Sequence, residues 1–457
     1  MTGDQIASRR STWQRLGITA LLALILVVYL AEANTRRVRI PNLPHQGDQS
    51  AYLEYARQMH ETNYGVVGGR ARMPGYPFLL SLIYEPGLED AEFLRRGQIL
   101  NIWFSVAVLL LLFLIYRRHF PPLYASALLA ITAFPVFYYR APWVQTEVLF
   151  YFASFCMFLA YWRMLVAPSF PVAAWAGLCT GLAHLLKASV LPAVALFTVC
   201  FIARSAWNFR RTRTAPVRSS SWREPAMLAL VLATFLAIVF PYLQTSKRVF
   251  GSYFHNASAS YYVWLDSWEE AKAFSKIARD RHGKPAVPPE QIPSASKYWR
   301  EHSVAQILSR LGHGVIGRLT HNARLDGYYK YVVLLAGIVG VLALHQRDKF
   351  VRMVRSQFFL AVFLALFFTG YLLLFAWYEA ISNDARFMLM LYLPFTFAAS
   401  KLIGRLAEGK TLQIGGRRVA QLTAVACVLL TLASAEAILN AVRLSGRPAA
   451  EPLGERG

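Results

Sequence analysis

The chain has 457 residues, of which 56% are hydrophobic and only 16% charged, and its mean hydropathy is +0.36. A water-soluble globule of this size carries fewer apolar residues and more charge, so the composition excludes a soluble protein. The formal net charge of +23 could suggest nucleic acid, but the lysines and arginines surround apolar stretches instead of gathering on one soluble domain. We therefore expect an integral membrane protein that binds no nucleic acid.

Apolar stretches of about 16 to 22 residues recur along the whole chain, and we count about eleven. Each is long enough to cross roughly 30 Å of hydrocarbon as a helix, which satisfies its own backbone hydrogen bonds. The expected fold class is an all-α polytopic membrane protein with amphipathic helices in its outer loops. The expected spans are 15–33, 98–116, 121–139, 144–165, 172–186, 188–203, 224–243, 330–345, 357–377, 387–404 and 419–440.

Basic residues alternate between the two sides of these spans and predict their orientation. One side carries the dense clusters at 9–15, 117–118, 204–223, 347–355 and 401–418. The short loops of the other side hold only Arg140, Lys187 and Arg386. By the positive-inside rule the amino terminus and the clusters face the cytoplasm, and the long loops 34–97 and 244–329 lie outside. We expect a multi-pass protein of a bacterial inner membrane.

The first outer loop contains "HQGDQSAYLEYARQM", in which Asp48 precedes a helical pattern. From Gln49 to about Thr62, apolar residues recur every three or four positions, namely Tyr52, Tyr55 or Ala56, and Met59, which predicts a short amphipathic helix at the membrane surface. Two interpretations of Asp48 stay open. Its carboxylate could cap this helix, or it could be an acid at the outer mouth of the bundle that accepts a proton from a hydroxyl.

The second outer loop predicts two more amphipathic helices. "DSWEEAKAFSKIARDRH" begins with Asp266 or Ser267 as its cap and has Glu269 and Glu270 in its first turn. "SKYWREHSVAQILSRLGHGVIGRL" follows after the Pro-rich linker "GKPAVPPEQIP". Neither outer loop is large enough for a soluble domain with its own core, so both are expected to cap the membrane domain.

Four motifs in order resemble one family of membrane enzymes. They are Asp48 followed by "YLEYA" and "RMPGYPFLL", "WVQTEVLF", "GLCTGLAHLLKASVLP" and "DARFMLMLYLPF". Together they resemble the GT-C glycosyltransferases of the protein O-mannosyltransferase and aminoarabinose transferase type (glycosyltransferase family 39-like), over about residues 15–405. The chain departs from that pattern at Gln49, where the family often has Glu, and at Lys187, where it has Arg. The first departure puts a metal-binding or second-carboxylate role at Asp48 in doubt, and the second forfeits bidentate phosphate binding.

The resemblance implies a sugar donor on a polyprenyl phosphate, an envelope acceptor (lipid, glycan or protein), and transfer on the extracytoplasmic face with inversion. Asp48 is then the general base, and Glu147 a second acid whose alternative role is a charge favoured by a helix dipole. Cations must meet the leaving phosphate, and the candidate substrate-binding residues are Arg70, Arg72, Tyr76, His184, Lys187 and Arg386. For the cations, solvation or snorkelling to the interface stays open. His184 could equally be a satisfied interfacial histidine, and Tyr76 a belt aromatic.

Neither a metal nor a cofactor is expected, because the sequence has no Asp-x-Asp, no His/Cys cluster with ligand spacing and no Gly-rich phosphate loop. Residues 1–405 are expected to form the transferase module, and 406–457 the last span and tail. A lipid or polysaccharide transporter or flippase remains the alternative, and its mark would be ionisable residues deep within several spans. A non-catalytic envelope scaffold is the third possibility. Changing Asp48 to Asn separates the enzyme from both.

Overall fold

The computed structural model describes residues 3–39, 44, 47–65, 71–212, 222–278, 285–325, 327–414 and 417–446. Within these residues the chain is helical almost throughout, as predicted. The exception is one antiparallel hairpin of β1 (Thr411–Ile414) and β2 (Arg417–Ala420), in which Thr411 pairs with Ala420. The sequence had indicated only a basic cluster at this place. The fold class is therefore an all-α polytopic membrane protein.

Eight helices of the described chain are long and apolar enough to cross a membrane. Two of these spans are continued by short turns: a π-helical turn (Ala133–Phe137) and α6 (Tyr138–Arg140) extend α5, and Tyr378–Ala380 extends α17. The turn Ala188–Val190 precedes α9 in the same way. The eight helices are α1 (Gly3–Arg39), α4 (Asp90–Arg117), α5 (Pro122–Thr132), α7 (Glu147–Val166), α9 (Leu191–Thr212), α10 (Arg223–Phe250), α17 (Phe358–Trp377) and α20 (Gln421–Ser445).

Three further predicted spans are helical but shorter. α8 (Phe170–Leu186) and α15 (Tyr329–His345) have 17 residues each, and α19 (Tyr392–Leu406) has 15. α15 and α16 (Arg347–Ser356) together are long enough to span, but they meet at a bend of 103°. By length and composition the structure therefore supports eight spans, or nine with the bent pair, where the sequence predicts about eleven.

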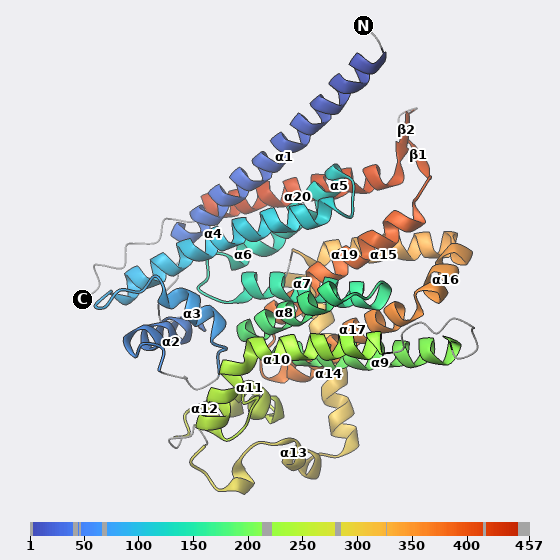
Figure 1. Cartoon of the computed structure of the whole chain (residues 1–457). Helices are drawn as coiled ribbons and strands as arrows, with labels where there is room; N and C mark the ends of the chain where they lie inside the picture. The colour runs from blue at the N-terminus through green and yellow to red at the C-terminus, as the bar shows by residue number, and fades with distance from the viewer. Residues whose placement is uncertain are drawn as a thin grey trace.

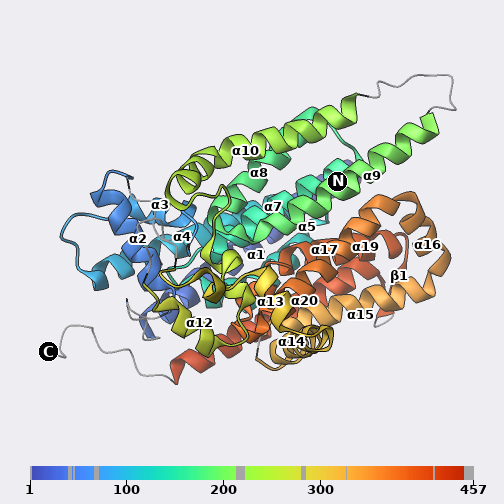
Figure 2. The same cartoon turned by 90° about the horizontal axis from the view of Figure 1, so that it is seen from below.

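The helices run roughly side by side, and the bundle has two distinct ends (Figures 1 and 2). α2 (Gln49–Glu61) and α3 (Gly75–Ser81) lie at one end, which we call the α2 end. α16 and the β-hairpin lie at the opposite end, which we call the α16 end. α2 confirms the amphipathic helix predicted from Gln49 to about Thr62, and its buried residues include the predicted Tyr52 and Met59.

The second long loop forms several short helices and one long one beside the bundle. α12 is capped as predicted, because the Ser267 hydroxyl accepts a hydrogen bond from the Glu270 N–H at 3.1 Å. The second predicted amphipathic segment is divided at His302 and Ser303 into two helices. The elements are α11 (Ala257–Ser260), α12 (Trp268–Ser275), α13 (Ala295–Glu301), α14 (Val304–Leu325), and the turns Tyr262–Trp264 and Pro289–Gln291.

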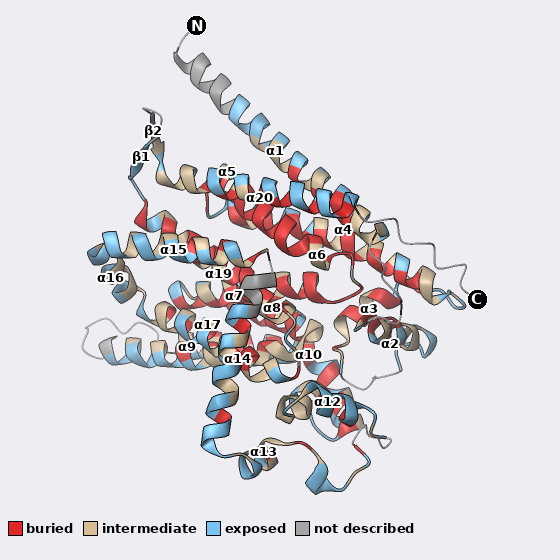
Figure 3. Ribbon diagram, turned by 180° about the vertical axis from the view of Figure 1, so that it is seen from behind, coloured by how far each residue is buried: buried red, intermediate tan, exposed pale blue. Residues whose placement is uncertain are grey.

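Buried side chains concentrate inside the bundle, while α9, α14 and α16 expose much of their surface (Figure 3). Glycines bring α8 and α10 unusually close. A Cβ atom on Gly177 would lie 2.5 Å from the Val231 carbonyl oxygen, and one on Gly181 would lie 2.6 Å from Ile238 Cβ. Small residues allow such approach between membrane helices. This contact fixes α8, whose final turn leads into Lys187.

Candidate active site

Asp48 does not cap the helix that follows it. Gly47, with φ +62°, turns the chain into the first turn of α2, and the Asp48 side chain makes no capping hydrogen bond. The carboxylate instead forms ion pairs with two arginines that are distant in sequence. Arg72 contacts Oδ1, and Arg386 Nη1 lies 2.5 Å from Oδ2. The Asp48 side chain is 23% exposed, so it lies between the protein interior and solvent.

Gln49, where the chain departs from the family pattern, has a structural contact. The side chain is fully buried, and its Oε1 accepts a hydrogen bond from the Val144 backbone N–H at 2.9 Å. Asn101 supports the same loop by donating to the carbonyl oxygens of Trp143 and Gln145. These bonds attach the beginning of α2 to the loop before α7, and so bring Asp48 towards Glu147.

Glu147 is the first residue of α7 and its side chain is only 3% exposed. Its Oε1 lies 3.2 Å from Lys187 Nζ and 3.9 Å from Arg386 Nη1. Its Oε2 is buried, with no hydrogen-bond partner among the described residues. The amino terminus of α7 thus favours the negative charge of Glu147. Lys187 and Arg386 stabilise the same charge.

Lys187 and Arg386 share a contact with one aromatic ring. Lys187 follows α8 in an extended conformation, and its Nζ lies 5.1 Å from the centre of the Phe387 ring. Arg386 begins α18 (Arg386–Leu389), and its Cζ lies 5.3 Å from the same ring. Cation–π contacts of this kind stabilise charges that are partly removed from water. Both side chains therefore point towards the carboxylates and not towards the lipid interface.

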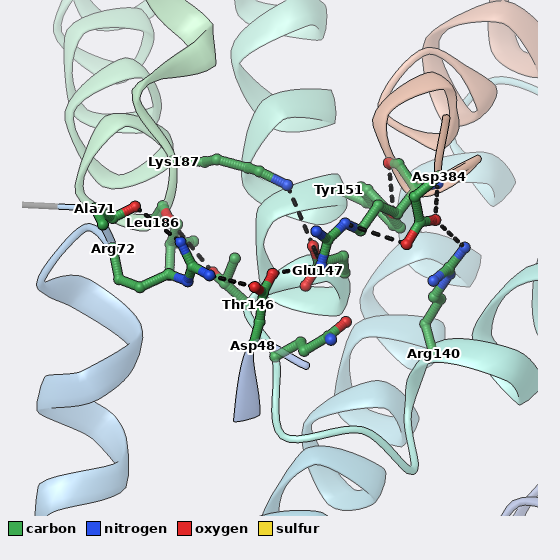
Figure 4. Close-up of polar contacts among 12 residues, drawn as sticks. Asp48, Ala71, Arg72, Arg140, Thr146, Glu147, Tyr151, Leu186, Lys187 and Asp384 are labelled. Carbon is green, nitrogen blue, oxygen red and sulfur yellow. Dashed lines mark hydrogen bonds and ion pairs between the residues drawn. The ribbon is translucent and has the colours of Figure 1, made fainter. Parts of the chain in front are cut away.

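Two residues of the cluster were missed by sequence reasoning. The Asp384 carboxylate accepts the Arg386 backbone N–H at 2.9 Å, and its Oδ2 lies 3.3 Å from Arg386 Nε. Arg140, at the end of α6, lies 3.2 Å from the same carboxylate. Figure 4 shows the labelled side chains of this cluster converging from separate helices and loops. A carboxylate two residues before a candidate arginine was the available signal for Asp384.

The arginines change the acidity of the exposed carboxylates. Partial burial raises the pKa of Asp48, but Arg386 and Arg72 outweigh it and hold the pKa below its ordinary value. Asp384 follows the same pattern: burial raises its pKa, and Arg140 and Arg386 bring it below the ordinary value. Both carboxylates are therefore ionised at neutral pH.

The remaining predicted residues lie outside this cluster of ion pairs. Tyr76 is fully buried and packs edge-on against Tyr52, whose ring centre lies 5.6 Å from Arg72 Cζ. His184 is buried among the rings of Phe235, Tyr242 and Phe254, and neither ring nitrogen has a hydrogen-bond partner among the described residues. The described residues thus supply no hydrogen bond to His184, and its role in substrate binding stays a prediction. Arg70 lies outside the described residues.

Comparison with known proteins gives distant structural likenesses. A scan against protein-family models finds no match, and a search of curated proteins finds none. Among solved structures, the oligosaccharyltransferase AglB from Archaeoglobus fulgidus, in complex with an inhibitory peptide and a dolichol-phosphate, is similar with 16% identity and a TM-score of 0.48. The likeness covers 96% of this chain and 57% of that protein. ArnT from Cupriavidus metallidurans, bound to undecaprenyl phosphate, is similar with 15% identity and a TM-score of 0.32, over 85% of this chain and 77% of that protein.

Proposed function

We propose that the chain is a GT-C membrane glycosyltransferase that moves a sugar from a polyprenyl-phosphate donor to a hydroxyl of an envelope acceptor. The observation that carries this proposal is the position of Asp48. Its carboxylate lies between Arg72 and Arg386 at one end of a membrane bundle, and Arg386 also approaches Glu147 beside Lys187. The four sequence motifs described above, which contain these residues, support the same family.

The cations of the cluster suit an anionic leaving group. Transfer of a sugar breaks the bond between its anomeric carbon and the phosphate oxygen, so negative charge grows on the phosphate. Arg72, Lys187 and Arg386 are supplied by three separate parts of the chain, and their ion pairs with Asp48 and Glu147 bring them to one place. Cations that are fixed before the reaction stabilise such charge without reorganisation, and the guanidinium groups can bind phosphate with two parallel hydrogen bonds.

Asp48 then accepts the proton of the attacking hydroxyl. The hydroxyl oxygen bonds to the anomeric carbon on the side opposite the phosphate, which inverts the configuration. While both arginines neutralise Asp48, its low pKa makes it a weak base. A donor phosphate that binds the same arginines competes with the carboxylate for them. Donor binding thereby raises the pKa of Asp48 and prepares it for the acceptor.

The charge distribution supports an extracytoplasmic site. The described basic residues at the carboxyl ends of α4, α9 and α19 are at the α16 end, whereas Asp48 and its partners lie at the α2 end. Because basic loops remain in the cytoplasm, the α2 end faces outward. No nucleotide-sugar pool is found there, so a lipid-linked donor, whose tail remains in the bilayer, suits this location.

The test is a transfer assay with membranes that contain the full chain. Undecaprenyl- and decaprenyl-phosphate sugars with labelled sugar groups are supplied, and transfer to envelope lipids, glycans and proteins is measured. We expect one labelled product class with the natural chain and none with Asp48→Asn at equal abundance. If no donor gives a product that depends on Asp48, the proposal is wrong. Movement of labelled lipid across the membrane without transfer would instead favour a flippase.

A further inference from the structure

A large apolar groove lies between helices, and its lining extends from Met388, two residues after Arg386, to Arg405 near the end of α19. It has a volume of about 730 Å³ and is lined by α15, α16, α17 and α19. Its α17 wall runs from Gln357 to Leu372, which at 1.5 Å per helical residue is about 22 Å. One leaflet contributes about half of the roughly 30 Å hydrocarbon core. The groove is therefore long enough to hold an acyl chain from one leaflet along its full length.

Cations lie at the α16 end of the groove. Lys401 and Arg405, one helical turn apart on α19, both line it. Neither forms an ion pair with any carboxylate in the described part of the chain, in contrast to the cations around Asp48. Two more cations, Arg118 and Arg163, act on the same place as Lys401. Burial and then these three cations lower the pKa of His119. This end of the groove therefore carries several positive charges and no carboxylate that pairs with them.

The amphipathic helix α16 places this end at the membrane interface. Phe350, Met353 and Val354 line the groove, whereas Arg352 and Arg355 are exposed on the other side of the helix. A basic amphipathic helix that follows a membrane helix at a bend of 103° is expected to lie in the interface plane. The cations at the groove are then at headgroup depth, and the apolar walls extend from there towards the bilayer centre.

We propose that this groove is a binding site for an anionic phospholipid of the leaflet at the α16 end. The lipid phosphate contacts Lys401 and Arg405, and one acyl chain occupies the space between α15 and α17. Two observations select this occupant: the groove is apolar and as long as such a chain, and its unpaired cations complement a phosphate headgroup. The headgroup end of the site is distinct from the charged cluster, because Lys401 and Arg405 follow Arg386 by 15 and 19 residues and lie in the second half of α19.

The experiment measures lipid retention by the purified full chain in detergent. Dioleoyl phosphatidylglycerol or dioleoyl phosphatidylcholine is added back after delipidation, and bound lipid is counted by native mass spectrometry. We expect preferential retention of phosphatidylglycerol by the natural chain. The double variant Lys401→Gln and Arg405→Gln should bind it about 30-fold more weakly, because each basic side chain near the headgroups contributes substantially to anionic lipid binding.

Two further variants make the result specific. Arg352→Gln with Arg355→Gln removes the same charge from the exposed face of α16 and should leave retention nearly unchanged. Gly340→Leu fills the groove, since a Cβ at Gly340 meets no atom within 4 Å, and should abolish retention while the protein stays folded. Equal losses in both double variants would show general attraction to basic surfaces and overturn the proposal. Equal retention of the two lipids would overturn it, as would displacement of phosphatidylglycerol by undecaprenyl phosphate at equal concentration.

Discussion

The two ends of the helical bundle both concentrate cations but neutralise them differently. In the charged cluster of the α2 end, four cations each form an ion pair with a carboxylate, and they are Arg72, Arg140, Lys187 and Arg386. At the α16 end a similar number form no ion pair within the described residues, and they are Arg118, Arg163, Lys401 and Arg405. The same residue types therefore have different environments at the two ends of one fold.

We interpret this difference as one between a catalytic site at the α2 end and a lipid-binding site at the α16 end. Carboxylates hold the cations of the α2 end in fixed positions, and they also limit the desolvation cost that each charge would have alone. An incoming anion can exchange with them, which changes the protonation of the displaced acid. The groove cations Lys401 and Arg405 have no such partner among the described residues, so we propose that their counter-charge comes from outside the protein. Chemistry is expected at the first end and lipid binding at the second.

The largest expected effect comes from changing the acid with two arginine partners. Asp48→Asn keeps the shape of the side chain but removes its ability to accept a proton. Positioned general bases typically contribute 10²–10⁴ in rate, so we expect sugar transfer to fall by about this factor. The measurement is the initial rate of transfer from labelled donor in membranes with equal amounts of each variant.

Glu54→Gln is the matched control for this change. Glu54 is an exposed acid on α2, and its partners are the neighbouring Arg57 and Gln58 on the same helix. Its neutralisation should leave transfer within about twofold, because exposed helix pairs contribute little. A similar rate loss in both variants would mean that α2 needs its charges for structure, and would remove the contrast between Asp48 and other acids.

The next effect concerns the cation that contacts three acids. Arg386 approaches Asp48, Glu147 and Asp384, so Arg386→Gln leaves several negative charges together at a partly buried place. Loss of one partner from a buried pair costs roughly 3–5 kcal/mol, and the partial exposure of this cluster reduces that figure. We expect about 2–3 kcal/mol, measured as the free energy of unfolding in mixed micelles.

Arg386→Lys and Arg204→Gln sharpen this prediction. The lysine retains the charge but not the planar fork, so stability should recover more than donor binding does. Arg204 has a single partner, Glu224, at 2.9 Å between α9 and α10. Its loss leaves one acid without its cation instead of three, so it should cost less than the loss of Arg386. If Arg204→Gln destabilises the protein as strongly as Arg386→Gln, multiple pairing at the α2 end has no special importance.

The sequence was most informative where a local pattern determines the structure. The helical spacing of Tyr52 and Met59 predicted α2, and Ser267 with Glu270 predicted the start of α12. The number of spans was less accessible, because apolar composition does not fix helix length. α8 ends at Leu186, where Lys187 adopts extended backbone. Tertiary contacts therefore decide whether an apolar segment becomes a long helix or a short one.

The structure brings together Asp48, Glu147, Lys187 and Arg386, which the sequence motifs contain, while their catalytic and binding roles stay predictions. Sequence reasoning missed Arg140, because its partner is 244 residues away in sequence and no local pattern joins them. The sequence analysis also gave both His184 and Lys187, one helical turn apart, as candidate substrate-binding residues. Since the helix ends between them, the imidazole packs against α10 while the ammonium turns towards Glu147.

A smaller effect should distinguish the two ends by pH. The pKa of Asp48 is below its ordinary value in the folded protein, so its ion pairs contribute stability above the unfolded pKa of about 3.9 and lose it as pH falls through the folded value. The unfolding midpoint should thus change little between about pH 7 and 5 and decrease below about pH 4. Asp48→Asn should weaken that decrease. Lys401→Gln with Arg405→Gln should leave it unchanged, since no carboxylate among the described residues pairs with either cation. If both variants change the decrease of the unfolding midpoint at low pH equally, the two ends of the bundle do not differ in their ion pairs as described.

The smallest expected effect tests the support of Arg386. Tyr151 donates its hydroxyl hydrogen to the Arg386 carbonyl oxygen at 2.8 Å, and Tyr392 donates to the Ile131 carbonyl oxygen at 2.7 Å, away from the charged cluster. Each Tyr→Phe change removes one such bond and should cost about 1 kcal/mol of unfolding free energy. Only Tyr151→Phe should also lower the transfer rate, by about threefold to tenfold, because it loosens the backbone of Arg386, the proposed phosphate-binding residue. Equal rates in the two variants would show that the ion pairs alone position Arg386, and that the hydrogen bond from α7 contributes stability but no alignment.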